Sequence, residues 1–229
     1  MLVLFDIDDT LIDHTSAVET GVAALHAELG APSDRSVFHE QWVAAMREHF
    51  PLYLRGELTY EEQRRARMRQ TVDANLSDAD ADDLFQHYFR AYENAWSSFP
   101  DVLACLAAVS SHTLGIISNG NGVEQRAKLA RTGIADRFQH VFISNDCGHA
   151  KPDAKIFHLA CHSAGCREQD AVYVGDFYEV DALGARGAGL TGIWLDRQSL
   201  RRPDHAPPVI RGLSELPALI RSFDLREAQ

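Results

Sequence analysis

The chain has 229 residues, of which 45% are hydrophobic and 24% charged, and its formal net charge is -11. This length accommodates one α/β domain with a smaller accessory unit, and the apolar fraction is too high for a disordered protein. The negative charge argues against nucleic acid or an anionic membrane as a partner, because both would repel the chain, but it leaves room for a small phosphorylated ligand.

Cysteine usage and the apolar runs indicate the compartment. The four cysteines form no C-x-x-C pair, and we expect ordinary thiols rather than a metal site, even in the CHSAGC segment at 161–166. The apolar run at the N-terminus, Leu2–Phe5, is too short for a signal peptide, and no stretch approaches the roughly 20 apolar residues of a membrane span. These features predict a protein of the reducing cytoplasm.

The first half of the chain predicts one strand followed by helices. Leu2–Phe5 is continuously apolar, as expected of a strand buried on both faces. A helix is predicted over 15–29, where apolar residues recur at helical spacing and Gly30 supplies the stop. Helical patterns continue to Trp96, and Thr59 with Glu62 forms a capping box at the start of an arginine-rich helix.

From Phe99 onward, strands alternate with helices. Further strands are predicted at 114–117, 141–143, 171–174 and 192–195. Helices are predicted at about 101–110 and 123–131, with Pro152 in the first turn of another. This alternation predicts a doubly wound, parallel α/β sheet of Rossmann-like type. Because one strand precedes the helical block, we expect a core of residues 1–13 and 97–229, interrupted by a helical domain at 14–96. Residues 201–208 are predicted as a surface loop.

Polar residues follow several of the predicted strands. In an open parallel sheet, ligands bind beyond the carboxyl ends of the strands, so we expect these side chains to share one crevice. They are Asp6, Asp8, Ser118, Asn119, Lys151 and Asp176.

Asp6 directly abuts the first apolar strand, and Asp8 follows two residues later. A carboxylate in that position is costly unless it is paired or bound to a metal. Two such carboxylates can divide the work of phosphoryl transfer, one attacking phosphorus and the other handling the proton of the leaving oxygen. The alternative is a pair of acids that cap a helix N-terminus, which explains poorly an acid directly at the strand end.

The segment Asp6-Ile7-Asp8-Asp9-Thr10 resembles the D-x-D-x-T motif of the haloacid dehalogenase-like (HAD) hydrolase superfamily. Ser118, Lys151 and Gly175-Asp176 to Asp181 resemble its three later motifs, in the same order and at predicted strand ends. The four motifs span residues 6 to 181.

The resemblance implies a magnesium-dependent phosphatase that works through an aspartyl phosphate on Asp6. It implies that Asp8 is the acid and base and that Lys151 neutralises charge, so that Asp6, Asp8 and Lys151 are catalytic. Ser118, Asn119 and Lys151 would bind the substrate phosphate. Mg²⁺ would be held by Asp6, the backbone carbonyl of Asp8, Asp176 and, at or behind the metal shell, Asp181.

The helical insert resembles the C1 cap of subfamily I, which would exclude water and select a small phosphorylated metabolite. The Arg55–Thr59 segment, Gln125 and Lys151-Pro152-Asp153 are similar to the 5'-nucleotidase and N-acylneuraminate-phosphatase branch. We expect the arginines at 64, 65, 67 and 69 to form a solvent-exposed helix face from which one or two side chains point inward.

Other activities of the family can be weighed on the residues. Asp8 and the acidic fourth motif argue against a carbon–halogen dehalogenase, and a cap without lysine argues against a phosphonate hydrolase. A phosphomutase remains open, as does a non-catalytic member that binds a phosphometabolite. Monomer and homodimer are both compatible with the sequence.

Overall fold

A computed structural model describes residues 1–30, 34–200 and 207–227. The chain divides into two compact units, one formed by Met1–Ile12 with Ser98–Gln229 and the other by Asp13–Ser97. The segment predicted as a surface loop at 201–208 lies mostly outside the described residues. None of the helices in the described ranges combines the length and apolarity that crossing a bilayer requires.

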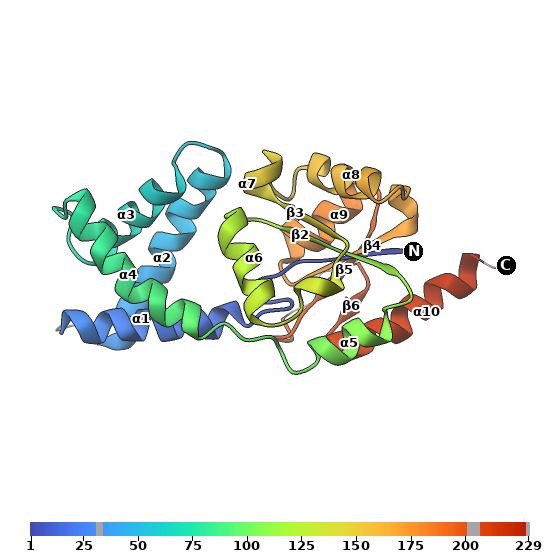
Figure 1. Cartoon of the computed structure of the whole chain (residues 1–229), viewed down its shortest axis with the longest axis horizontal. Coiled ribbons are helices and arrows are strands. Elements are labelled where there is room, and N and C mark those ends of the chain that lie inside the picture. Colours follow the sequence, from blue (N-terminus) through green and yellow to red (C-terminus); the bar gives the residue numbers. More distant parts are fainter. Residues whose placement is uncertain (31–33, 201–206, 228–229) are drawn as a thin grey trace. The chain divides into compact units, whose positions relative to one another are not determined.

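The first unit is built on a parallel sheet of six strands in the order β3-β2-β1-β4-β5-β6. Figure 1 labels β2 to β6 of this sheet. The strands are β1 (Leu2–Phe5), β2 (Thr113–Ser118), β3 (His140–Ile143), β4 (Ala171–Gly175), β5 (Thr191–Leu195) and β6 (Val209–Ile210). Phe5 at the end of β1 is in register with Ile116 of β2 and Val174 of β4. The chain winds outward from β1 first through β2 and β3 and later through β4 to β6, so the direction of winding reverses beside β1, where α/β sheets bind ligands.

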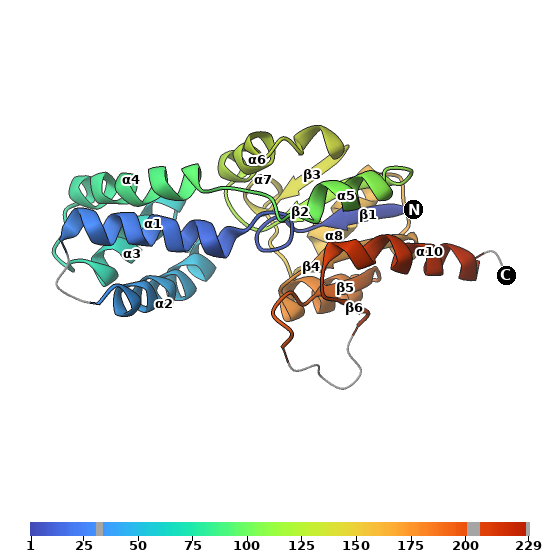
Figure 2. The ribbon, with the colours of Figure 1, turned by 90° about the horizontal axis from the view of Figure 1, so that it is seen from below.

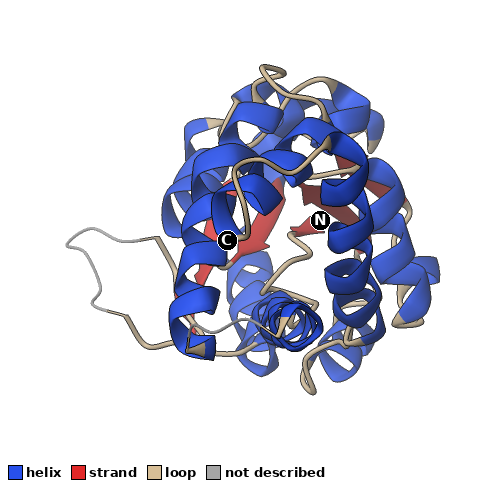
Figure 3. Ribbon diagram, turned by 90° about the vertical axis from the view of Figure 1, so that its left-hand side faces the viewer, coloured by secondary structure: helices blue, strands red, loops and turns tan. Residues whose placement is uncertain are grey.

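Helices cover both faces of this sheet, and Figure 3 shows the strands among them. The α-helices among the described residues of this unit are α5 (Val102–Ala108), α6 (Gly122–Arg131), α7 (Ser144–Cys147), α8 (Ala154–Ser163), α9 (Gly184–Gly187) and α10 (Leu216–Glu227). Val3 and Phe5 pack in one buried cluster with residues of α5, α6 and α10, whereas Leu2 and Leu4 pack in a second with residues of α8 and α9. The predicted doubly wound α/β fold is confirmed.

Within residues 13–30 and 34–97, the second unit contains four α-helices, which are labelled in Figure 2. They are α1 (His14–Leu29), α2 (Arg35–Leu54), α3 (Tyr60–Thr71) and α4 (Asp78–Asn94). The predicted capping box is present, since the Thr59 hydroxyl accepts from Glu62 N and the Glu62 carboxylate accepts from Thr59 N, while Gly30 ends α1 in the left-handed conformation. A Cβ on Gly21 of α1 would lie 2.7 Å from the ring of Tyr88, so a glycine here lets α1 and α4 pack closely.

The arginines of α3 divide between solvent and interior. Arg65 and Arg69 form ion pairs with carboxylates of α4, Arg65 with Asp78 and Asp82, and Arg69 with Asp78. Arg67 is buried, with its guanidinium 4.4 Å from the ring centroid of Trp42. The face therefore contains surface ion pairs and an inward-facing member, as the sequence predicted.

Three local features differ from the expectations. Pro152 does not lie in the first turn of a helix, because α8 begins at Ala154 with Asp153 as its N-cap, and Asp153 accepts a hydrogen bond from Lys155 N. An aspartate satisfies the first free N–H groups of a helix, which proline cannot do. The peptide bond before Pro152 is cis. Two short elements that the sequence pattern did not indicate, α7 and the two-residue strand β6, are also present.

Candidate active site

The carboxyl ends of β1, β2 and β4 bring the predicted site residues together. Asp6 follows β1 and its backbone N–H donates to the carbonyl of Val174 in β4, which fixes the acid at the sheet edge. Ser118 is the last residue of β2, and Asp176 follows β4. Lys151 comes from the segment before α8, and its Nζ lies 2.7 Å from Oδ1 of Asp6.

A buried hydrogen-bond network surrounds the Lys151 ammonium. Its Nζ donates to Asp6 Oδ1, Asp181 Oδ1 and the Tyr173 hydroxyl, each at 2.7 Å. The Tyr173 hydroxyl donates in turn to the carbonyl of Ile117 at 2.8 Å. The lysine side chain is 3% exposed and those of Asp6 and Asp181 are 9% and 1% exposed. The three donors of the ammonium therefore each have a partner, and Lys151 is held in one position.

Burial changes the proton affinities in this cluster. Burial raises the pKa of Asp6 to about 7, with a further contribution from the Asp181 charge, although Lys151 opposes both. Burial also raises the pKa of Asp176 well above its ordinary value, and the Asp6 and Asp181 charges add to this effect. For Lys151, burial opposes the charged form, but the carboxylates of Asp181 and Asp6 outweigh it and the pKa is raised. The ammonium thus persists at neutral pH, whereas the acids carry more negative charge than their surroundings readily accept.

The donor set fits a hard divalent cation. Oxygens of Asp6, Asp176 and Asp181 lie within 4.8 Å of one another, and no other such group of His, Cys, Asp or Glu occurs in the described part of the chain. Three carboxylates facing a single ammonium leave two negative charges, the charge that Mg²⁺ would neutralise, and carboxylate oxygens are ligands that Mg²⁺ prefers. Asp181 already bonds Lys151 and, through Oδ2, Phe177 N at 2.9 Å, which places it as a support of the cluster as much as a ligand.

Thr10 and Trp194 fix the position of Asp176. The Thr10 hydroxyl lies 3.3 Å from Oδ1 of Asp176 and accepts a hydrogen bond from its backbone N–H at 3.1 Å. The indole N–H of Trp194 donates to the backbone carbonyl of Asp176 at 2.8 Å. Thr10, the threonine of the D-x-D-x-T segment, therefore connects the loop after β1 with the loop after β4.

Gly175 is required by the close approach of Asp181. A Cβ at this position would lie 2.4 Å from Cγ of Asp181, closer than real Cβ contacts occur. We expect Gly175→Ala to displace Asp181, to lower the free energy of unfolding by about 1–3 kcal/mol and to reduce activity through Lys151. Chemical denaturation and steady-state kinetics measure both effects. Gly187→Ala is the matched control, because a Cβ there meets nothing within 4 Å. Equal stability of the two variants would contradict the close contact.

The side chain of Asn119 hydrogen-bonds to the backbone of Lys151. Its Oδ1 accepts from Lys151 N at 2.8 Å and its Nδ2 donates to Lys151 O at 3.0 Å, so the side-chain amide pairs with both backbone groups of one residue. Ser118 is 1% exposed, and its hydroxyl accepts from Gln125 Nε2 at 3.0 Å. A role of Ser118 and Asn119 in substrate binding stays a prediction.

Asp8 accepts hydrogen bonds from Gln125 and Lys128 of α6, for which the sequence predicted no role at the site. Lys128 Nζ lies 2.8 and 3.0 Å from the two carboxylate oxygens, and Gln125 Nε2 donates to Oδ2 at 2.8 Å. The signal was present in the helix pattern, since Gly122, Gln125, Lys128 and Leu129 share the buried face of α6. A lysine on that face is the anomaly that could have drawn attention.

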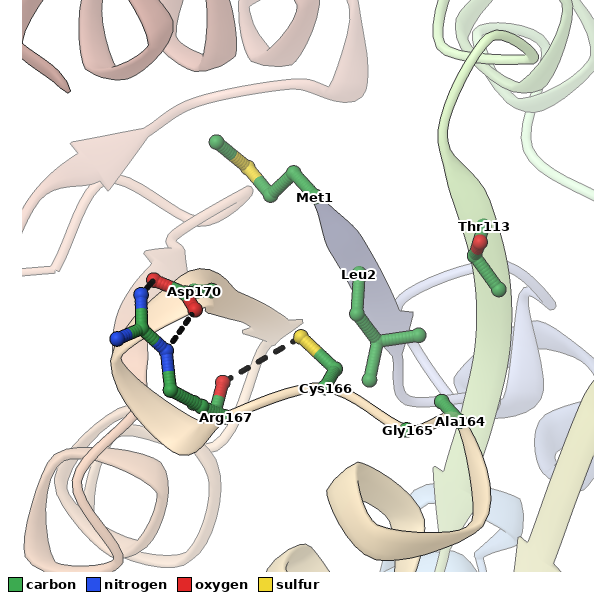
Figure 4. Close-up of a pocket in the computed structure, with 8 residues that line it drawn as sticks. All are labelled: Met1, Leu2, Thr113, Ala164, Gly165, Cys166, Arg167 and Asp170. Carbon is green, nitrogen blue, oxygen red and sulfur yellow. Dashed lines mark hydrogen bonds and ion pairs between the residues drawn. The ribbon is translucent and has the colours of Figure 1, made fainter.

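A cavity of about 310 Å³ lies elsewhere in the first unit (Figure 4). Its lining includes Met1 and Leu2 at the start of β1 and Thr113 at the start of β2, so it is at the amino ends of the strands. Arg167 and Asp170, which also line it, are paired with each other. Chemistry at the carboxyl ends of the strands does not involve this cavity.

The fold and the site together define a parallel α/β hydrolase with an acidic cluster at its central strand ends. The chain belongs to the haloacid dehalogenase-like hydrolase family, whose sequence model matches residues 1–189. It is a phosphohydrolase of that family. It is 28% identical over 222 residues to pyrimidine 5'-nucleotidase YjjG of Escherichia coli, covering 95% of this chain and 96% of that protein. It is 25% identical over 239 residues to N-acylneuraminate-9-phosphatase of Mus musculus, covering 98% and 95%. The predicted family and branch resemblance are confirmed.

Solved structures share the architecture. HAD-hydrolase YfnB from Bacillus subtilis, bound to magnesium, superposes with a TM-score of 0.79 at 23% identity, covering 96% of this chain and 97% of that one. The 2-haloacid dehalogenase from Pseudomonas syringae superposes with a TM-score of 0.71 at 30% identity, covering 97% and 98%. The same architecture therefore occurs in proteins named for different chemistries, and the site residues must decide between them.

Proposed function

We propose that this protein is a Mg²⁺-dependent phosphatase that hydrolyses a small phosphate monoester through an aspartyl phosphate on Asp6. The observation that carries the proposal is the placement of Asp6. It ends the central strand with Oδ1 on the Lys151 ammonium, while within the described residues Oδ2 makes no hydrogen bond to protein. One oxygen is thus oriented by a cation, and the other is available to a phosphorus atom or a metal ion.

The chain's own residues account for both halves of the reaction. A carboxylate oxygen of Asp6 bonds to phosphorus, the bond from phosphorus to the leaving oxygen breaks, and Asp8 gives that oxygen a proton. In the second half, a water oxygen bonds to phosphorus, Asp8 takes a proton from it, and the phosphorus–Asp6 bond breaks to restore the carboxylate. Lys151 and Ser118 stabilise charge on the equatorial oxygens throughout.

Mg²⁺ held by Asp6, Asp176 and the backbone carbonyl of Asp8, with Asp181 beside them, would neutralise charge on the phosphate. The charge balance of the cluster and its oxygen donors support this assignment. The cytoplasmic location, the cap role of residues 14–96 and the choice between monomer and homodimer stay predictions.

A carbon–halogen hydrolase is the competing activity, because a dehalogenase is among the similar structures. Displacement of a halide requires neither a proton for the leaving group nor a metal ion. Asp8, held by two donors, and the acidic cluster at β4 both favour the phosphatase. A phosphomutase would use the same residues and would be recognised by formation of a bisphosphate.

The test is a substrate panel at saturating Mg²⁺ and again with a chelator. We expect inorganic phosphate to be released from at least one nucleoside monophosphate, sugar phosphate or phospho-acid, and release to stop with the chelator. Chloride release from 2-chloropropionate in the chelator arm, with no phosphate release in either arm, would overturn the proposal in favour of dehalogenation. Transfer to a second hydroxyl without free phosphate would indicate the mutase.

Mg²⁺ binding should weaken as the pH falls below about 7. Because the pKa of Asp6 is raised to about 7 in the metal-free protein and that of Asp176 is raised as well, the cation must displace bound protons as the pH falls. For one displaced proton, the apparent dissociation constant should rise about tenfold per pH unit below 7. Calorimetric titration of Mg²⁺ at pH 6 and pH 8 measures this, with Asp176→Asn as the variant expected to bind poorly at both. A dissociation constant that does not change with pH would contradict the raised pKa.

A further inference from the structure

Lys128 is a buried cation for which the proposed reaction, as described so far, has no use. Its side chain is 2% exposed, and its Nζ contacts both oxygens of Asp8 and, at 3.3 Å, the Glu124 carboxylate. Burial disfavours the ammonium, but the Asp8 and Glu124 charges outweigh burial and raise the Lys128 pKa, so the group is charged at neutral pH. Burying a lysine is costly, and a lysine on a helix of this kind could reach solvent at little cost. Its inward position therefore calls for a reason.

Gln125 contacts Asp8 from the same face of α6. Its Nε2 lies 2.8 Å from Asp8 Oδ2, 3.0 Å from Ser118 Oγ and 3.1 Å from Asn119 O, and the carboxylate and the carbonyl accept only. Because these acceptors surround Nε2, the amide NH₂ group of Gln125 points at Asp8. The Oε1 atom of Gln125 is buried with no hydrogen-bond partner among the described residues, so this orientation satisfies the donor and leaves the acceptor unsatisfied.

Gly120 makes room for this arrangement. Its φ is +138°, and a Cβ there would lie 3.2 Å from Gln125 Nε2. The backbone after β2 thus approaches the amide so closely that a side chain would have to displace it. Gln125 is consequently held against both the first and the second strand end of the site.

We propose that Lys128 and Gln125 are positioning residues that hold the Asp8 carboxylate in one orientation beside Ser118. The inference rests on the proposed phosphatase function, in which Asp8 delivers a proton to the leaving oxygen. Two donors from one helix act on the same carboxylate, and one of them also bonds the residue predicted to hold the phosphate. The pair thereby fixes the proton donor relative to the bound phosphate, while contacting neither phosphate nor metal ion.

Substrates whose leaving groups differ in basicity distinguish a loss of Asp8 positioning from a general loss of folded protein. Phosphate esters of acidic phenols need little proton donation, whereas alkyl phosphates depend on it. The value of kcat/KM reports the reaction up to formation of the phosphoenzyme. For Lys128→Met we expect kcat/KM on an alkyl phosphate to fall by about 10- to 100-fold more than on 4-nitrophenyl phosphate. Inhibition by inorganic phosphate should change by less than about threefold, because Lys151 is untouched.

Matched variants complete the experiment. Lys155→Met removes the exposed lysine of α8 and should retain both activities. Lys128→Arg keeps the charge and should restore part of the alkyl phosphate activity. Gln125→Met should show the same selective loss as Lys128→Met, and it decides the question if Lys128→Met does not fold.

The outcomes distinguish this inference from the function it rests on. If the unaltered protein shows no Asp6-dependent phosphate release, the proposed function fails. If that release is present but both variants lose aryl and alkyl activity equally, or lose neither, the positioning role is overturned while the phosphatase stands.

Discussion

Asp6→Asn should abolish phosphate release, lowering kcat by on the order of 10⁴-fold or more. Asparagine has the same shape but cannot form the acyl phosphate. The loss should fall on kcat rather than on KM, because Lys151 and Ser118 still face the phosphate. Steady-state kinetics on the best substrate of the panel measures it.

This substitution should not unfold the protein. The raised pKa of Asp6 reflects an unfavourable buried charge, so removing that charge should leave the metal-free protein at least as stable as before. Asp9→Asn is the matched control, since it neutralises an acid in the same segment. If Asp6→Asn and Asp9→Asn retained similar activity, Asp6 could not be the nucleophile.

Lys151→Met should lower both the stability and the activity of the protein. Methionine fills a similar volume but leaves Asp6 and Asp181 without their shared cation, and breaking a buried ion pair costs about 3–5 kcal/mol. For a chain of this size, that corresponds to a fall in Tm of about 10 °C. Activity should fall by about 10²- to 10³-fold through loss of charge stabilisation. Thermal unfolding and kinetics measure the two effects.

The pH dependence of this loss is specific. The Lys151 pKa is raised in the folded protein, so its stabilising contribution is fully present below the unfolded value and is lost only as the pH rises through the folded value. The contribution of the Lys151 charge itself should therefore be fully present from pH 6 to 9. Because Lys151 also lowers the pKa of Asp6, the Asp6 carboxyl of the variant should keep its proton to higher pH, so the stability difference between Lys151→Met and the unaltered protein should be present at pH 6 and grow toward pH 9. Lys155→Met is the surface control. A difference that vanished by pH 8 would mean that Lys151 is not the buried cation described above.

Much of the fold was predictable because its elements carry strong local signals. Leu2–Phe5 is apolar throughout since β1 lies between two strands with helices on both faces. The capping box at Thr59 and the stop at Gly30 are local side-chain and backbone preferences, and both occur as expected. Strand β6 has only two residues, too few for a periodic pattern to develop, and it forms because β5 offers an edge.

The clustering of the candidate site residues was predictable for the same reason that the sheet was. Acids and hydroxyls directly after apolar strands stand out against their neighbours, and a parallel sheet brings strand ends together. Lys151 lies well beyond the predicted strand at 141–143, so the strand-end argument supports it less directly, and its role was predicted from the resemblance to the third family motif. The partner of Lys151 that the sequence did not indicate is Tyr173, which lies in the apolar strand β4, where a tyrosine is an ordinary core residue.

Lys128 and Gln125 illustrate what sequence alone conveys poorly. Both lie in a helix rich in charge, where a lysine at one position differs little from an arginine at the next. Their significance depends on Asp8, which is 120 residues from Lys128 in sequence. The helix pattern indicates that Gln125 and Lys128 lie on the buried face of α6, but which residue they contact depends on how α6 packs against the sheet.

The most direct test of the account is to look for the covalent intermediate. The unaltered protein, mixed with a good substrate and Mg²⁺ and quenched in acid during turnover, should carry a phosphoryl group on the peptide that contains Asp6. Mass spectrometry of the peptides identifies the residue, and the Asp6→Asn protein should carry none. A phosphoryl group trapped on the Asp6→Asn protein, or rapid turnover of the unaltered protein with no phosphoryl group on Asp6, would contradict the account.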